Sequence, residues 1–107
     1  MVIFKKEIFM ETILKNFLTE GKLTKMPSKR KMKLWALLYL GSKFEAGKTY
    51  TEKEVNELLK SWHTFGDPAT LRRELYNHRI IDRSPDGAEY RLEEHQPTYE
   101  ELEKLYG

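Results

Sequence analysis

The fold of this chain is decided by residues 51–92, which read TEKEVNELLKSWHTFGDPATLRRELYNHRIIDRSPDGAEYRL. The stretch opens on a capping box, because Thr51 is placed to accept a hydrogen bond from the amide of Glu54, whose carboxylate reaches back. The apolar residues that follow recur at helical spacing and predict a helix over residues 52–62. Residues 63–66, with the sequence HTFG, are predicted to be a tight connector after this helix.

A second helix and a hairpin complete the stretch. Asp67 is a favourable N-cap and Pro68 fits the first helical position, so we expect a helix over residues 68–78. Two helices joined by a short connector that contains Gly form a helix-turn-helix. Strand-forming residues then flank the Pro-Asp-Gly turn at 85–87, and this pattern predicts a β-hairpin over residues 80–92.

Two further helices are predicted upstream. Residues 3–19 have a broad apolar face and are predicted to form a first helix that ends at Gly21. The apolar residues of this helix are Ile3, Phe4, Ile8, Ile13, Leu14, Phe17 and Leu18. Ser28 is predicted to cap a second helix over residues 29–42, and residues 48–50 are predicted to form a very short strand.

Downstream, Thr98 and Glu101 form another capping box, which predicts a short acidic helix over residues 99–106. We therefore expect a mainly α, α+β class: a winged helix-turn-helix-like domain with an extra N-terminal helix and a short C-terminal helix. The parts of this single domain are an N-terminal helical extension (1–20), a winged-helix-like core (21–92) and an acidic C-terminal helix (93–107). The side chains expected to be buried are Leu37, Leu38, Val55, Leu58, Leu71 and Leu75.

Length and composition exclude several classes of protein. The 107 residues fit one domain, and a hydrophobic fraction of 39% supports one modest core. The chain has no Cys, which excludes disulfides and Cys-based zinc sites. The longest apolar run, residues 34–40, is too short to span a bilayer, and the N-terminus lacks the features of a signal peptide. We expect a cytoplasmic protein with no membrane association.

No set of residues forms a complete active site. The serines lack the context of an activated nucleophile, and the six Gly are scattered rather than gathered in a phosphate loop. The three His show no metal-ligand spacing, and His63 is expected to cap the helix that it follows. We therefore expect a protein that is not an enzyme and needs no cofactor or metal.

The positive charge is concentrated in the first half of the chain. Residues 1–48 hold 11 Lys and Arg against 4 Asp and Glu, whereas residues 49–107 hold 8 against 13. A basic run at the predicted start of the second helix contains Lys29, Arg30, Lys31 and Lys33. Cations in a first helical turn cost about 0.3–1 kcal/mol each, and a bound anion would remove that conflict. Two interpretations stay open: phosphate contacts, or a solvated basic patch.

The helix over residues 68–78 has suitable residues for reading bases. If Leu71 and Leu75 face the core, Thr70, Arg73 and Asn77 lie near the opposite face. Arg72, Tyr76 and Arg79 lie to one side of that face. Because Arg pairs with guanine and Asn with adenine in the major groove, Thr70, Arg72, Arg73 and Asn77 are candidate nucleic-acid contacts. The alternative is that Arg72 and Arg73 pair with Glu74, Asp67 or the neighbouring helix.

The hairpin adds two candidates, Arg83 and Arg91, near its strands. Such wings commonly contact the DNA backbone or minor groove. The tip of this hairpin carries Asp86, with Glu89 beside it, and an acidic tip is a poor probe for DNA.

From about Gly21 to Leu92 the chain resembles a bacterial family of unknown function, whose members occur alone or attached to ArsR-like winged-helix regulators. The most specific matching segments are Pro27 with Lys29–Lys31, Tyr50–Glu52 with Glu54–Asn56, and Thr70–Leu75. The resemblance implies a winged-helix-like fold and a link to transcription, but no catalytic residues.

One departure from the family pattern concerns the turn after His63. Family members usually carry an acidic pair there, whereas this chain has Thr64-Phe65-Gly66-Asp67-Pro68. His63 and Asp67 keep the end residues of that pattern, but the turn between them differs.

These observations support two hypotheses of different classes. The first is a nucleic-acid-binding module of transcriptional regulation, with double-stranded DNA as the partner. The second is a protein-interaction or dimerisation module that forms a homodimer through its apolar N-terminal helix, without binding DNA.

Overall fold

Five helices and two small sheets make up this α+β structure, and the computed structural model describes the backbone of residues 2–107 and the side chains of residues 8–107. In chain order the elements are α1 (Val2–Ile13), the 3-10 helix η1 (Lys15–Phe17), β1 (Leu18–Thr19), β2 (Lys22–Leu23), α2 (Arg30–Gly41), β3 (Tyr50–Thr51), α3 (Glu52–Lys60), α4 (Pro68–Asn77), β4 (Ile81–Arg83), β5 (Glu89–Leu92) and α5 (Tyr99–Tyr106). None of the helices in this described part has the length and apolar character that a bilayer crossing requires.

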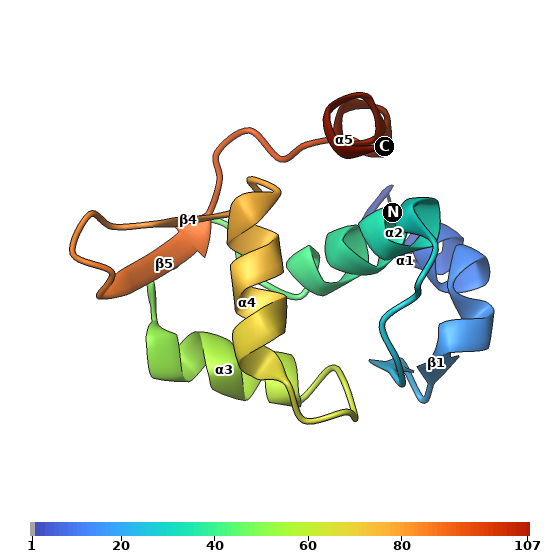
Figure 1. Ribbon diagram of the computed structural model, residues 1–107, viewed down its shortest axis with the longest axis horizontal. Coiled ribbons are helices and arrows are strands. Elements are labelled where there is room, and N and C mark those ends of the chain that lie inside the picture. The colour runs from blue at the N-terminus through green and yellow to red at the C-terminus, as the bar shows by residue number, and fades with distance from the viewer. Residues whose placement is uncertain (1) are drawn as a thin grey trace.

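The helix α2 lies at the centre of the packing. Both α1 and α5 pack on α2, while α3 packs on α4, which also contacts α2 and β4. Figure 1 shows α3, α4 and the hairpin on one side of α2 and the α1–β1 segment on the other. The largest fully buried side chains are Tyr39, Leu14, Leu23, Leu34, Leu37, Leu40, Leu59, Leu71, Leu75, Ile80, Ile81 and Leu102.

The three-stranded sheet joins the hairpin to the strand before α3. Its strands are antiparallel in the order β3-β5-β4, so that β5 lies in the middle. Tyr50 pairs with Tyr90, and Arg83 pairs with Tyr90 from the other side. Asp82 pairs with Arg91. Since paired residues point to the same face and neighbours along a strand to opposite faces, Arg83 and Arg91 lie on opposite faces of the hairpin.

Three of the four predicted N-cap side chains are confirmed. Thr51 and Thr98 each form a capping box, with Glu54 and Glu101 respectively. Asp67 accepts a hydrogen bond from the amide of Thr70. The helices α3, α4 and α5 therefore begin where the sequence predicts, because a side chain satisfies amides that the first turn leaves without a partner.

The predicted helix over residues 3–19 is wrong in its second half. The helix α1 ends at Ile13, and the chain continues through η1 into the β1–β2 hairpin. Glu20 and Gly21 form its two-residue turn with φ values of +52° and +77°. Gly21 therefore serves a hairpin turn rather than a helix end, because two-residue hairpins favour turns with positive φ at both positions.

Two further predictions are wrong in part, and a third concerns side chains outside residues 8–107. The N-cap of α2 is Lys29 rather than Ser28, and no side chain caps this helix. Leu38 and Leu58 are only half-buried, whereas the other four predicted core residues are buried. The predicted contributions of Ile3 and Phe4 lie outside the described side chains.

Gly41, the last residue of α2, provides a test of core packing. A Cβ at this position would lie 2.5 Å from Cγ2 of Ile80, far inside van der Waals contact. We expect Gly41→Ala to lower the free energy of unfolding by about 1–2 kcal/mol in urea titrations, although Ala favours helices over Gly. In the Ile80→Ala background the same substitution should cost little, because Cγ2 is absent; an equal loss in both backgrounds would contradict this explanation.

Candidate nucleic-acid interface

The exposed face of α4 is centred on Arg73. Asp67 and the N-terminal Pro68 start the helix, and Leu71 and Leu75 fix its orientation because both are buried. The side chains on the opposite, solvent-facing side include Thr70, Arg73, Tyr76 and Asn77. The structure thus brings together three of the predicted contacts, Thr70, Arg73 and Asn77, on one accessible surface.

Arg72 points elsewhere, although it is the immediate neighbour of Arg73. Its guanidinium donates to Oδ1 of Asn56 and lies 3.6 Å from a carboxylate oxygen of Glu52. It also lies over the ring of Tyr90, and only 17% of its side chain is exposed. Arg72 therefore ties α4 to α3 and to the sheet, which is the alternative that the sequence left open.

Tyr76 links the α4 face to the hairpin. The guanidinium of Arg83 lies 4.9 Å from the centre of the Tyr76 ring, at the distance of a cation–π contact. Arg83 keeps its exposure in this position. Arg91 projects from the other face of the hairpin, so it does not join Arg73 and Arg83.

The acidic tip of the hairpin has a structural explanation. Asp86 accepts hydrogen bonds from Oγ of Ser84 at 2.6 Å and from the amide of Ala88 at 3.0 Å. The Ser84 hydroxyl and the Ala88 amide lower the pKa of the Asp86 carboxyl. Asp86 is thus part of the turn that shapes the hairpin, in the manner expected of Asp at such positions.

Most carboxylates of residues 67–92 have hydrogen-bond partners within the domain, whereas most arginines of the same segment have no ion-pair partner among the described side chains. Four of the five carboxylates, all but that of Glu89, accept hydrogen bonds from within the described part of the domain: Asp67, Glu74, Asp82 and Asp86. Four arginines form no ion pair with any described side chain: Arg73, Arg79, Arg83 and Arg91. All four residues are exposed, so their guanidinium groups are available to an anionic partner.

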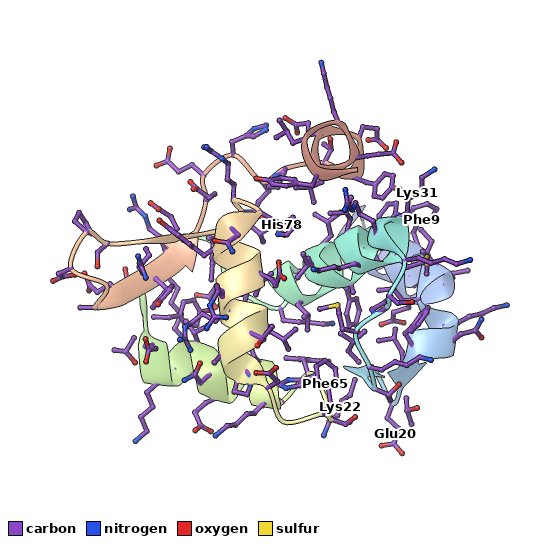
Figure 2. All side chains as sticks on the ribbon, in the orientation of Figure 1. Phe9, Glu20, Lys22, Lys31, Phe65 and His78 are labelled. Atoms are coloured by element: carbon purple, nitrogen blue, oxygen red, sulfur yellow. The ribbon has the colours of Figure 1, made fainter. Side chains whose placement is uncertain are left out.

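The basic start of α2 already has partners from α5. Arg30 donates to the backbone oxygen of Tyr106 at 3.0 Å, and Lys31 lies 3.6 Å from Glu103. Since carbonyls at a helix C-terminus carry partial negative charge, α5 offsets the cations in the first turn of α2. Figure 2 shows Lys31 on the side of α2 that faces α5.

The two predicted clusters of cations lie close to each other. Lys33 forms a 3.0 Å ion pair with Glu74, which connects α2 to the side of α4. The hydroxyl of Tyr106 donates to the backbone oxygen of Asn77, so the end of α5 lies between Arg30 and the α4 face. Among Lys29, Arg30, Lys31 and Lys33, Lys29 alone makes no ion pair or side-chain hydrogen bond with the described residues.

His63 holds the connector between α3 and α4. Its Nδ1 lies 2.6 Å from the backbone oxygen of Leu59, and its Nε2 lies 2.9 Å from the amide of Asp67. A carbonyl only accepts and an amide only donates, so Nδ1 must carry the proton and Nε2 must accept. His63 thus caps α3, as predicted, but it does so as a neutral ring that also fixes the start of α4.

Tyr76 and Arg79, which helical spacing places to one side of the α4 face, are not among the predicted contacts, although both are exposed. Tyr76 follows Arg73 by three residues, and that spacing places both on one helix face. Arg79 directly follows the helix predicted over residues 68–78. Among the described residues, no three His, Asp or Glu side chains come together as a metal ion would require.

Comparison with known proteins gives a family match over the central part of the chain. No curated protein and no solved structure matches the chain. Residues 22–92, which run from β2 to the end of β5, match the model of DUF2087, described as an uncharacterized protein conserved in bacteria. The helices α1 and α5 lie outside the matched segment. The chain therefore belongs to the DUF2087 family.

Proposed function

We propose that this chain is a non-catalytic nucleic-acid-binding module of winged helix-turn-helix type, which binds duplex DNA through α4 and the β4–β5 hairpin. The order of α2, β3, the α3–α4 pair and the hairpin supports the winged-helix assignment. The pairing of β3 with β5 supports it too, because it closes the first strand onto the hairpin. A bacterial cytoplasmic role in transcription is part of this proposal.

The proposal rests on two exposed arginines, Arg73 on α4 and Arg83 on the hairpin, where Arg83 lies over the ring of Tyr76 of α4. In helix-turn-helix proteins the second helix lies in the major groove, so α4 would present Arg73 to the base edges. Thr70 and Asn77 flank Arg73 and offer further hydrogen bonds. Arg83 would meet the phosphate backbone beside the groove.

The other predicted contacts would differ in whether they touch DNA. Arg72 positions α4 and does not touch DNA, because its donors are engaged with Asn56 and Glu52. Arg91 lies on the far face of the hairpin. The cluster at the start of α2 would act at the edge of the interface, with Lys29 as its most available cation.

Fluorescence anisotropy with a labelled random duplex, titrated across salt, tests this function. Two to four phosphate contacts would lower the affinity about 10- to 100-fold between 50 and 200 mM salt. We expect Arg83→Ala to weaken binding about 3- to 5-fold and to flatten the salt dependence, whereas the matched control Arg91→Ala should bind like the parent. Absence of binding at low salt, or equal losses in both variants, would count against the proposed surface.

A second candidate function is homodimerisation through the N-terminal helix. It is favoured by Ile8 and Phe9, whose exposed fractions are 60% and 57%. Phe9 packs edge-on against Trp35 and presents the rest of its ring to solvent. Light scattering would favour this alternative if it gave twice the chain mass of 12.8 kDa together with no duplex binding.

A further inference from the structure

The backbone at Arg79 adopts a conformation that side chains disfavour. Its φ of +60° lies in the left-handed region, which glycine occupies without steric cost. Among the described non-glycine residues, only Glu20 shares a positive φ. For Glu20 the reason is the two-residue turn between β1 and β2.

The conformation at Arg79 belongs to the way α4 ends. The amide of Arg79 donates to the carbonyl of Tyr76 at 3.1 Å, and the amide of Ile80 donates to that of Leu75 at 3.0 Å. These two bonds define a Schellman motif, in which the residue at the position of Arg79 is usually Gly. The fold therefore requires this backbone shape, but it does not require an arginine there.

Contacts within the domain do not explain the arginine either. Its neighbours His78 and Ile80 are buried, whereas Arg79 is exposed. The guanidinium makes no hydrogen bond, ion pair or ring contact with any described side chain. A residue that breaks a local backbone rule without a compensating contact is a candidate for a functional side chain.

Arg79 is also held firmly at the edge of the proposed interface. It lies two residues after Asn77 and four before Arg83, between α4 and β4. The next residue is anchored, because the carbonyl of Ile80 accepts from the amide of Glu93 and from Nε2 of Gln96. A fixed backbone reduces the ordering cost of binding, and the planar guanidinium fork matches a phosphate group.

We infer that Arg79 contacts a DNA backbone phosphate next to the groove that α4 enters, and this inference rests on the proposed function. Base edges are read mainly from the N-terminal part of a recognition helix, so a residue beyond its C-terminus meets the backbone. The side chain of Arg79 is thus a sequence-independent contact that keeps α4 in register.

The test compares Arg79→Gly with Glu20→Gly, since both substitutions place Gly at a left-handed position. Figure 2 shows Glu20 far from the end of α4 that carries His78, so Glu20→Gly controls for the backbone change alone. We expect both variants to match or exceed the parent in Tm, by up to about 5 °C. Arg79→Gly should also bind a labelled random duplex about 3- to 10-fold more weakly, with a salt slope smaller by about one. Glu20→Gly should leave affinity and slope unchanged, and Arg79→Lys should recover part of the affinity.

The outcomes separate this inference from the proposed function. If Arg79→Gly binds like the parent while Arg73→Ala loses affinity, the inference is overturned and the proposed function stands. If Arg79→Gly lowers Tm where Glu20→Gly does not, the arginine is a structural residue of the helix end, and the inference fails again. If the parent protein binds no duplex at low salt, the proposed function fails and the inference with it.

Discussion

Arg73→Ala is expected to reduce duplex affinity about 10- to 100-fold and to leave stability within about 0.5 kcal/mol of the parent. Arg73 is exposed and forms no ion pair with the described side chains, so its removal leaves no buried group without a partner. If it contacts a base edge in the major groove, the loss of a bidentate contact accounts for the drop in affinity.

The adjacent Arg72→Ala should behave in the opposite way. Its loss leaves Asn56 and Glu52 without their partner and opens space over Tyr90. We expect it to lower the free energy of unfolding by about 1–3 kcal/mol in urea titrations, because a hydrogen bond to a charged group is lost. Once the variant is folded, its affinity should fall less than that of Arg73→Ala. An equal loss of affinity in two stable variants would place both arginines in the interface and refute the assignment.

The contrast between Arg72 and Arg73 shows what the sequence can predict about the site. Helical periodicity places Arg73 opposite Leu71 and Leu75, and the structure agrees. Arg72 lies at the border of that face, where periodicity leaves its direction open. Its direction depends on Glu52 and Asn56, which belong to another helix.

The fold was predictable where short-range interactions decide it. The helices α3, α4 and α5 begin at Thr51, Asp67 and Thr98, and each cap reaches an amide only three residues away. The Pro-Asp-Gly turn of the hairpin is similarly local, since Asp86 bonds to Ser84 and Ala88. In these segments the residues that form the hydrogen bonds lie two or three positions apart in the sequence.

The start of the domain was mispredicted because distant residues decide it. The β2 strand is held by the amide of Leu23, which donates to Trp62, and by the amide of Thr64, which donates to Leu23. Those partners are about forty residues away in the sequence, so the residues next to β2 do not predict them. Likewise Arg30 and Lys31 find their partners in α5, at the far end of the chain. Contacts with α5 therefore offset the unfavourable cations in the first turn of α2, and these contacts could not be predicted from the neighbouring sequence.

His63→Ala is expected to cause the largest loss of stability, about 2–4 kcal/mol. The substitution leaves the amide of Asp67 without its partner and removes one hydrogen bond to the carbonyl of Leu59, which still accepts from the amide of Trp62. It also removes a ring that packs edge-on against Phe65 at 4.7 Å, which leaves a cavity. Because this connector sets the start of α4, duplex affinity should fall as well, even at temperatures where the variant is folded.

Urea titrations of two partial replacements and one control make this expectation specific. An Asn amide approximates Nδ1 and a Gln amide approximates Nε2, so His63→Asn and His63→Gln should each keep one bond and lie between the parent and His63→Ala. His95→Ala is the control, because His95 is exposed and, among the described side chains, pairs only with Glu101, a contact worth about 0–1 kcal/mol. If His63→Ala costs no more than His95→Ala, the neutral ring does not hold the connector, and the link from His63 to Asp67 would lose its role in orienting α4.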